Sequence, residues 1–325
     1  MRRNETACSF GVDSDIPGWS LRCVQTTSGA LNGGARELHV SGVQVLEERY
    51  RHVVTNHFGT ALPDSIGFVF APQLRDRGMF NGQDWRSGTL CLWNTDREFN
   101  AILPPADIVC VMVNRALLVE HIAQTEQVDL EPELLRSSLV FGTPEVTGML
   151  ARQLSELVAA GFGREWDATT PAAQQAIRQE VLERLAPLVV EQLDGRHDQP
   201  THFRHLTTVR RAREVALAHS DTPVQVQDLC RELQVSRRTL QDSFRTVLGI
   251  GPLWYLRTLR LDGARRGLLA GSSVREVAET WGFWHWSRFS RDYRLLFGEL
   301  PSATLKRAAS SGATAIPLTR WPHFT

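Results

Sequence analysis

The sequence is almost without lysine, and this scarcity excludes one large class of nucleotide-binding proteins. Lys306 is the only lysine among 325 residues, so the chain has no Gly-x-x-x-x-Gly-Lys-Ser/Thr loop to hold a nucleoside triphosphate. The Gly-x-Gly-x-x-Gly pattern of dinucleotide-binding folds and the His-Glu-x-x-His pattern of zinc hydrolases are missing too. We therefore expect no catalytic residue, no cofactor and no metal site, and we do not expect an enzyme.

Cysteines and long apolar runs are also scarce. The cysteines are Cys8, Cys23, Cys91, Cys110 and Cys230. An odd, unclustered set argues against a disulfide framework or a zinc knuckle and favours the reducing cytosol. No apolar run reaches the roughly 20 residues of a membrane helix, and polar residues follow the basic start where a secretory signal needs an apolar core. We expect a cytoplasmic protein that does not bind a membrane.

Net charge is zero over the whole chain, but the two parts of the chain differ sharply in charge. Residues 1–200 contain 17 Lys and Arg against 26 Asp and Glu, a net charge of −9. Residues 201–325 contain 19 Lys and Arg against 10 Asp and Glu, a net charge of +9. Such asymmetry suggests that the basic C-terminal part binds nucleic acid and that the N-terminal part is a separate acidic domain. Basic domains also bind RNA, anionic lipid or acidic proteins.

The first part of the chain has the pattern of short β-strands over residues 36–114. Segments 65–71 and 89–93 are short apolar runs bounded by Gly and Pro, and 107–114 is the clearest strand because it is rich in Val and Ile. Strands at this spacing predict a small β-sandwich or barrel, for which a cupin-like form is one option. We assign residues 1–130 to this strand-rich domain.

Two histidines in this region do not have the neighbours of a metal site. His52 and His57 lie five positions apart, and no matching set of Glu and His follows them. A cupin-type metal site needs a tighter cluster, so we expect both to be structural or surface residues. From Arg115 onward the apolar spacing changes to that of a helix.

Residues 131–195 are predicted to be helical. Thr143 and Thr170 each precede a proline, which is the start signal of a helix. Pro187 should kink the second helix or end it late. The apolar stripes of the two helices fit either a cover over the core or a dimer interface, and the sequence leaves both open. A polar stretch follows, from which we assign a linker to residues 196–205, and we expect a loosely ordered tail over 309–325.

An internal repeat lies beyond the linker. In the first copy Leu240, Phe244 and Leu248 are followed by Gly249, and Pro252 comes three residues later. In the second copy the equivalent residues recur at a constant offset of 49, as Phe289, Tyr293, Phe297, Gly298 and Pro301. The second copy has one extra residue in its turn. Two tandem units of the same kind are therefore expected, at about 224–247 and 272–297.

Each copy has the pattern of two helices joined by a tight turn. Leu240, Phe244 and Leu248 recur every four residues and so form one stripe on the second helix, which we expect to be core. The opposite face is polar, and Ser236 is placed to cap the helix. This is the arrangement of a helix-turn-helix, whose second helix, the recognition helix, enters the major groove of DNA.

Residues 206–308 resemble the DNA-binding domain of the AraC/XylS family of transcription regulators. The pattern of the family's second unit is matched by Gly282, Phe283, Phe289, Ser290, Arg291, Tyr293, Arg294, Phe297, Gly298, Pro301 and Ser302. The pattern of its connecting helix is matched by Pro252, Tyr255, Leu256, Arg260, Leu261 and Ala264. The departures are bulky Trp284 and Trp286 in the turn, and Leu305 where an aromatic residue is usual. The stretch VSRRTLQDSFRTVLGIGP is similar, more weakly, to the ethanolamine-operon regulator and its relatives.

The resemblance implies which side chains contact DNA. Base edges would be contacted by Arg238, Gln241, Asp242, Trp286, Ser287, Ser290 and Arg291. Phosphates would be contacted by Arg237, Arg245, Arg288 and Arg294. Arginine can pair bidentately with guanine and glutamine with adenine, whereas phosphate contacts position the protein without reading sequence.

The resemblance also implies the fold and the function of the whole chain. We expect an α+β protein with a strand-rich N-terminal domain that senses a small molecule and an all-α C-terminal domain that binds double-stranded DNA. It would activate a metabolic operon, with RNA polymerase as a partner and a homodimer as its assembly. The alternatives are a sensor of a partner protein, an enzyme with an appended DNA-binding domain, and an architectural DNA binder. None of the cysteines has the Pro-Cys-His context of the repair methyltransferases that carry such a domain.

Overall fold

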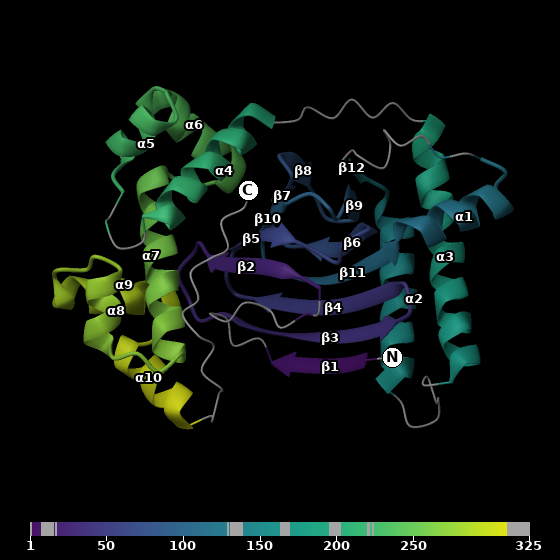
Figure 1. Cartoon of the computed structure of the whole chain (residues 1–325), viewed down its shortest axis with the longest axis horizontal. Helices are drawn as coiled ribbons and strands as arrows, with labels where there is room; N and C mark the ends of the chain where they lie inside the picture. The colour runs from purple at the N-terminus through teal and green to yellow at the C-terminus, as the bar shows by residue number, and fades with distance from the viewer. Residues whose placement is uncertain are drawn as a thin grey trace.

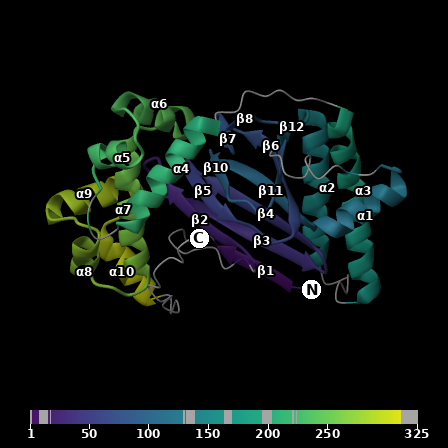
Figure 2. The ribbon, with the colours of Figure 1, turned by 45° about the horizontal axis from the view of Figure 1, so that its top comes forward.

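A computed structural model describes residues 2–7, 16, 18–128, 130, 139–162, 170–194, 203–219, 222 and 224–310. The described part is built in layers, which Figures 1 and 2 show from two sides. Three helices lie on one side of two β-sheets, and the C-terminal helices lie on the other side. The predicted class, a strand-rich N-terminal domain followed by an all-α C-terminal domain, is confirmed.

Two antiparallel sheets form the N-terminal domain. In spatial order, the larger sheet consists of β1 (Arg2–Ala7), β3 (Asn32–Val40), β4 (Val43–Arg51), β11 (Ala106–Asn114), β6 (Ser65–Leu74), β9 (Thr89–Asn94) and β12 (Leu139–Phe141). The smaller sheet consists of β2 (Ser20–Gln25), β5 (Thr55–Thr60), β10 (Phe99–Leu103), β7 (Gly78–Phe80) and β8 (Gln83–Trp85). The strands expected at 65–71, 89–93 and 107–114 are all present.

Both faces of the larger sheet are covered, and β11 shows why its sequence is a continuous apolar run. Val109, Val111 and Val113 face the helices on the outside. Cys110 and Met112, which alternate with them, face the smaller sheet. Because side chains in a strand point alternately to opposite faces, a strand buried on both sides must be apolar throughout.

The interior between the sheets is filled by aromatic rings. Trp85, Trp93, Phe80 and Phe99 contact one another with ring centroids 5.2–6.2 Å apart. Gly67 makes room for one of them, since a Cβ atom there would lie 2.5 Å from the indole of Trp93. Aromatic pairs at these distances add to the free energy gained from burial alone.

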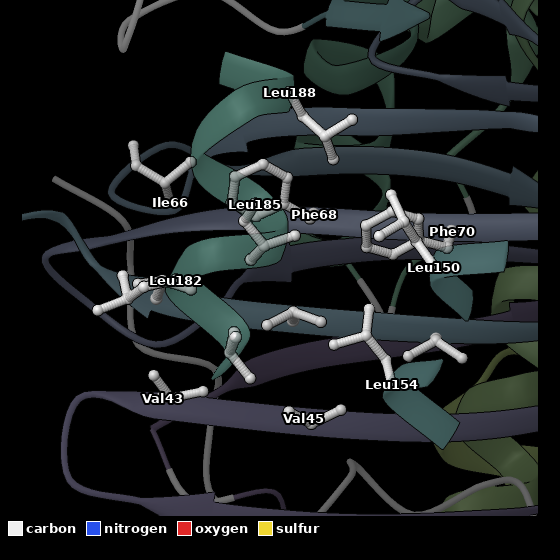
Figure 3. Close-up of a cluster of buried hydrophobic side chains, with 14 of the residues drawn as sticks. Val43, Val45, Ile66, Phe68, Phe70, Leu150, Leu154, Leu182, Leu185 and Leu188 are labelled. Carbon is white, nitrogen blue, oxygen red and sulfur yellow. The ribbon is translucent and has the colours of Figure 1, made fainter. Parts of the chain in front are cut away.

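The outer face of the larger sheet is covered by α1 (Arg115–Thr125), α2 (Pro144–Phe162) and α3 (Pro171–Asp194). Figure 3 shows Leu154 and Leu185 above Val45 and Phe68 of the sheet. Leu154 and Leu157, from the stripe that the sequence left open between core and dimer interface, are both buried within the chain. Their burial favours the core alternative for this stripe, and dimer formation stays a prediction.

Two local expectations for residues 131–195 need correction. Leu139–Phe141 is a strand rather than a helix, because its backbone pairs with Leu90–Leu92 of β9 at the edge of the sheet. Pro187 does not end α3, which continues to Asp194. Residues 203–205 of the predicted linker belong to α4, and residues 309–310 of the predicted tail belong to α10. Residues 196–202 of the linker and 311–325 of the tail lie outside the described residues.

In its described residues, the C-terminal domain contains helices and no strand. The helices are α4 (Phe203–Ala218), α5 (Val226–Glu232), α6 (Arg237–Leu248), α7 (Pro252–Leu269), α8 (Val274–Thr280), α9 (Trp286–Phe297) and α10 (Pro301–Ser310). The long α7 connects the α5–α6 pair to the α8–α9 pair, as Figure 1 shows. Among the described helices, none is both long enough and apolar enough to cross a membrane.

Candidate nucleic-acid interface

Each predicted unit is a pair of helices held by a buried stripe. Leu240, Phe244 and Leu248 of α6 are at most 4% exposed, and their repeat counterparts in α9 are buried as well. Phe289, Tyr293 and Phe297 follow one another with ring centroids 5.8 and 4.6 Å apart. These rings are therefore core, as the spacing predicts, and the opposite faces of α6 and α9 are left for other contacts.

Local hydrogen bonds fix where the helices begin. The hydroxyl of Ser236 accepts from the backbone N–H of Thr239 at 3.0 Å, so Ser236 caps α6 as expected. Ser273 and Glu276 form a reciprocal capping box at the start of α8. Hydrogen bonds from the backbone and hydroxyl of Ser273 lower the pKa of Glu276. Both α6 and α9 end at a glycine with positive φ, Gly249 and Gly298, the backbone conformation that ends many helices.

The side chains predicted to read bases lie on the outer faces of α6 and α9. The side chains of Arg238 and Arg291 are 92% and 76% exposed. Gln241 and Ser290 are half-buried, and Trp286 is 48% exposed. The remaining members of the predicted set are all exposed: Asp242, Ser287, Arg237, Arg245, Arg288 and Arg294. The structure thus brings the two groups of predicted residues to the surface of two separate helices.

Asp242 is close to a predicted base-reading arginine. Its Oδ2 lies 3.7 Å from Nε of Arg238, one helical turn earlier on α6. A carboxylate at this distance can hold the guanidinium in one orientation before DNA arrives, although an exposed ion pair contributes only about 0–1 kcal/mol to stability. The family resemblance implies that Asp242 contacts a base edge, and this geometry is also compatible with a role in orienting Arg238.

Two arginines of α7 position the second unit, and the sequence interpretation gave neither of them a role. Arg257 forms an ion pair with Asp292 of α9, whose side chain is 6% exposed. Arg260 donates to the carbonyl oxygens of Trp281 and Gly282, at 2.8 and 2.6 Å, and its guanidinium lies 4.3 Å from the ring centroid of Phe283. Together they fix the turn between α8 and α9.

The sequence pattern of α7 could have predicted that Arg257 and Arg260 pair within the protein. Buried residues lie on nearly every side of α7 rather than along one stripe. A helix packed on all sides that still contains arginines must give them internal partners, because a buried charge without a partner is costly. The near absence of an amphipathic pattern over 252–269 could therefore have pointed to Arg257 and Arg260.

Polar side chains also lie deep between the sheets of the N-terminal domain. The indole of Trp19 donates to Gln44 at 2.8 Å, and Gln44 donates to the buried carboxylate of Glu37 at 2.7 Å. In a second group, the hydroxyl of Tyr50 donates to Glu48 at 2.8 Å, and burial raises the pKa of this carboxyl group. Within the described part of the chain, no group of His, Cys, Asp and Glu has the arrangement of a metal site.

His57 lies in the same interior, and burial decides its protonation. Its ring meets the ring of Tyr50 edge-on with centroids 5.0 Å apart, and Nε2 lies 2.8 Å from the hydroxyl of Thr55. Burial lowers the pKa of His57 to about 4, so the imidazole is neutral near pH 7. His57 is thus a buried structural residue, and His52 is an exposed one.

Comparison with known proteins agrees with the geometry of the C-terminal helices. Residues 229–307 match the family described as helix-turn-helix domain. A probable thc operon regulatory protein from Rhodococcus erythropolis is 38% identical over 102 residues, which cover 30% of this chain and 31% of that protein. The XylDLEGF operon transcriptional activator from Pseudomonas putida is 35% identical over 88 residues, 26% of this chain and 27% of that protein.

A solved structure is similar over the same share of the chain. It is a probable AraC family transcriptional regulator from Rhodopseudomonas palustris CGA009, 32% identical, and the match covers 31% of this chain and 97% of that one with a TM-score of 0.30. The C-terminal domain belongs to the AraC/XylS family. The family resemblance that the sequence indicated is thereby confirmed for this domain, and the two curated relatives are regulators of operons.

The AraC/XylS match is a match between domains rather than whole proteins. The chain spans about a third of the length of the two curated relatives, 31% and 27%. These relatives are regulators of the thc and XylDLEGF operons and give no support to the ethanolamine sub-branch that one stretch of the first unit suggested.

Proposed function

We propose that the protein is a transcription regulator that binds a specific double-stranded DNA site and activates an operon. The observation that carries this proposal is the pair of recognition helices, α6 and α9, held on one connecting helix with exposed Arg238 and Arg291. The net charge of +9 on residues 201–325 favours binding to a polyanion. Activation is the function printed for the relative from Pseudomonas putida, and it comes to this chain as part of the proposal.

Each of the two helices would contact both base edges and phosphates. Arg238 would pair with a guanine and Gln241 with an adenine, while Arg291 would contact a base edge in the second groove segment. Arginines on the flanks of both helices would hold the backbone: Arg237, Arg245, Arg288 and Arg294. Two recognition helices on successive major-groove segments lie about one DNA turn, ~34 Å, apart. The site should therefore contain two short, different blocks about 10 base pairs apart.

The N-terminal domain would sense a small molecule between its sheets. Glu37 is 3% exposed, and in the described part of the chain its Oε2 has no hydrogen-bond partner. The same holds for the indole N–H groups of Trp85 and Trp93. Buried polar atoms are normally paired, so unpaired polar groups in this interior support a partly polar effector. The identity of the effector stays open.

The remaining partners are part of the same proposal. A regulator of this kind would act in the cytoplasm, contact RNA polymerase at the promoter, and form a homodimer. The helices of residues 131–195 complete the core of the first domain, and the basic C-terminal helices pack against the smaller sheet of that domain.

In vitro selection of random duplexes by the full-length protein tests this proposal. We expect the selected duplexes to share two different blocks about 10 base pairs apart. The double variant Arg238→Ala with Arg291→Ala should select no common sequence while it still retains duplexes at low salt. If wild-type protein retains duplexes without enriching any sequence, the protein is a general DNA binder and the proposed function is wrong.

A further inference from the structure

The N-terminal domain contacts α4 and α7, which pack against the first helix-turn-helix unit, and α9 of the second unit. We propose that this domain sets the relative orientation of the two recognition helices, with Gln25 and Gly29 as positioning residues for α9. The inference rests on the proposed function, since orientation matters only if both helices meet one DNA site. The contacts to the two units differ in kind.

The first unit is joined to the smaller sheet through a common apolar core. Val24, Phe58 and Ile102 on the outer face of this sheet pack in one cluster with Val209 of α4 and Tyr255 of α7. Three buried polar contacts cross the same boundary. Arg213 forms an ion pair with Glu98, Arg22 lies 3.2 Å from Asp262, and the hydroxyl of Tyr255 donates to Asn56 at 2.8 Å.

These contacts leave little freedom for the first unit to move on the sheet. The side chains of Arg22 and Asp262 are each 5% exposed, and the guanidinium of Arg213 lies 3.8 Å from the ring centroid of Phe58. Separating the surfaces would expose the apolar side chains of the shared cluster to water, which is unfavourable, and would break the polar contacts that cross it. The α4–α7 side of the first unit is thus fixed to the smaller sheet.

The second unit is held by the loop that follows β2. Nε2 of Gln25 lies 2.5 Å from the carbonyl oxygen of Leu296 in α9 and 2.7 Å from the carbonyl oxygens of both Thr27 and Gly29, so its two N–H groups are shared among three acceptors. The backbone N–H of Gly29 donates to the same Leu296 oxygen at 3.0 Å. A further bond ties this loop to α7, where the indole of Trp254 donates to the carbonyl of Thr26 at 2.9 Å.

The target of this loop is a group that a helix leaves without an internal partner. The last four carbonyl groups of a helix have no N–H of the helix to accept from, and Leu296 lies in the last turn of α9. Gly29 has a φ of +133°, a backbone conformation that side chains disfavour, so this position of the loop depends on glycine. The loop thus caps the C-terminal end of the second recognition helix.

The sequence repeat supplies an internal comparison. Gly298 ends α9, and a Cβ atom there would lie 3.4 Å from the backbone nitrogen of Ala30 in the loop. Its counterpart Gly249 ends α6, and a Cβ atom there would meet nothing within 4 Å. Two equivalent helix ends therefore differ: the loop covers the end of the second recognition helix and leaves the end of the first one open.

The docked domain does not cover the residues that would read DNA. Arg238 and Arg291 remain 92% and 76% exposed with the N-terminal domain in place. Blocking of the DNA-binding surface is therefore not how this contact acts. A domain that fixes α4 and α7 with one surface and the end of α9 with a loop instead determines the angle and distance between α6 and α9.

The test uses the full-length protein and duplexes in which the separation of the two selected blocks is changed by one or two base pairs. One base pair moves the second block by about 3.4 Å and turns it by about 34°. Wild-type protein should lose about tenfold or more in affinity for each such change. Gln25→Glu replaces the donating amide by a carboxylate that repels the Leu296 carbonyl, so its affinities should stay within about threefold of one another.

Control variants separate the loss of the loop contact from a general effect of added charge or of misfolding. Gln73→Glu introduces the same charge at an exposed position of β6 and should keep the wild-type profile. If Gln25→Glu does not fold, Gln25→Ala and Trp254→Phe remove donors from the two sides of the loop and should flatten the profile in the same way. A profile equal to that of wild type, or a uniform loss at every spacing, overturns the inference. Wild-type protein that selects no sequence overturns the proposed function instead.

Discussion

The hydroxyl of Tyr255 donates a 2.8 Å hydrogen bond to Oδ1 of Asn56, which lies 199 residues earlier in the chain and in the other domain. Asn56 is held from its second side by its own amide group, which donates to Asn100 and to the carbonyl of Ala101. Burial raises the pKa of Tyr255, so the phenol stays protonated and acts as a donor. A single bond thus connects strand β5 of the sheet to the helix that joins the two units.

Removal of this hydroxyl should weaken the contact between the domains. Tyr255→Phe leaves a buried acceptor on Asn56 without its partner, which costs about 1–3 kcal/mol, and amide hydrogens of β5 should exchange faster. Tyr293→Phe is the matched control, because the hydroxyl of Tyr293 pairs with Thr304 inside the C-terminal domain. Hydrogen exchange with urea unfolding measures both effects. Equal exchange of β5 in the two variants would show that the Tyr255 bond does not hold the domains together.

The helices over the larger sheet should behave as core. Leu154 is fully buried against the sheet, so Leu154→Ala should lower the free energy of unfolding by about 2–5 kcal/mol. Met149→Ala, on the same helix at a side chain that is 47% exposed, should change it by about 0.5 kcal/mol or less. Sedimentation of both variants should give the mass of wild type. A fall to half the mass with little loss of stability in Leu154→Ala would identify these helices as a dimer interface.

Local patterns in the sequence were enough to predict the two units and the strands at 65–71, 89–93 and 107–114. Leu240 and Phe244 lie four positions apart, and the same spacing recurs 49 residues later. This spacing predicts the buried stripe of each recognition helix. Residues 107–114 were recognisable as a strand because both of its faces are buried and the run is apolar throughout. These features depend on neighbours within one element, which a sequence displays directly.

Contacts between distant segments could not be predicted in this way. Arg22 and Asp262 are 240 residues apart, and each looks like an ordinary surface charge in its own segment, so only the docked domains reveal the pair. The strand Leu139–Phe141 is too short for a periodic pattern, and its pairing partner lies in β9. Pro187 was expected to kink a helix or end it late; α3 continues past this residue with buried side chains packed on the sheet, and the kink stays a prediction.

Stability should depend on pH through His57. The folded state holds the pKa of this group at about 4, below its usual 6.5, so between these values the unfolded chain binds a proton that the folded chain does not. The stabilisation is therefore present above pH 6.5 and is lost as the pH falls toward 4. At ~1.4 kcal/mol for each unit, the loss is roughly 3 kcal/mol.

A comparison with His57→Gln isolates this contribution. Burial raises the pKa of Glu48, which acts in the opposite direction, but that group is present in both proteins. Urea unfolding at pH 7, 6 and 5 should show wild-type protein losing stability more steeply than His57→Gln. Parallel curves for the two proteins would mean that His57 takes up its proton in the folded state as readily as in the unfolded chain.

Arg294 should act on all DNA sequences alike. It is exposed on α9 and is assigned to a phosphate, which is the same group at every position of a duplex. Arg294→Ala should weaken binding to selected and scrambled duplexes nearly equally and reduce the slope of log affinity against log salt by about one unit. Arg86→Ala, an exposed arginine of the N-terminal domain, should leave the slope unchanged. A loss confined to the selected duplex would assign Arg294 to a base edge.

The central claim is that α6 reads sequence, and Arg238 tests it most directly. The measurement is the affinity of Arg238→Ala and wild-type protein for the selected duplex and for a scrambled one, titrated over salt. We predict a loss of about 1–3 kcal/mol on the selected duplex, a relaxed preference at one base pair, and little change on the scrambled duplex. Equal losses on both duplexes would contradict the account, because Arg238 would then only position the protein on the DNA.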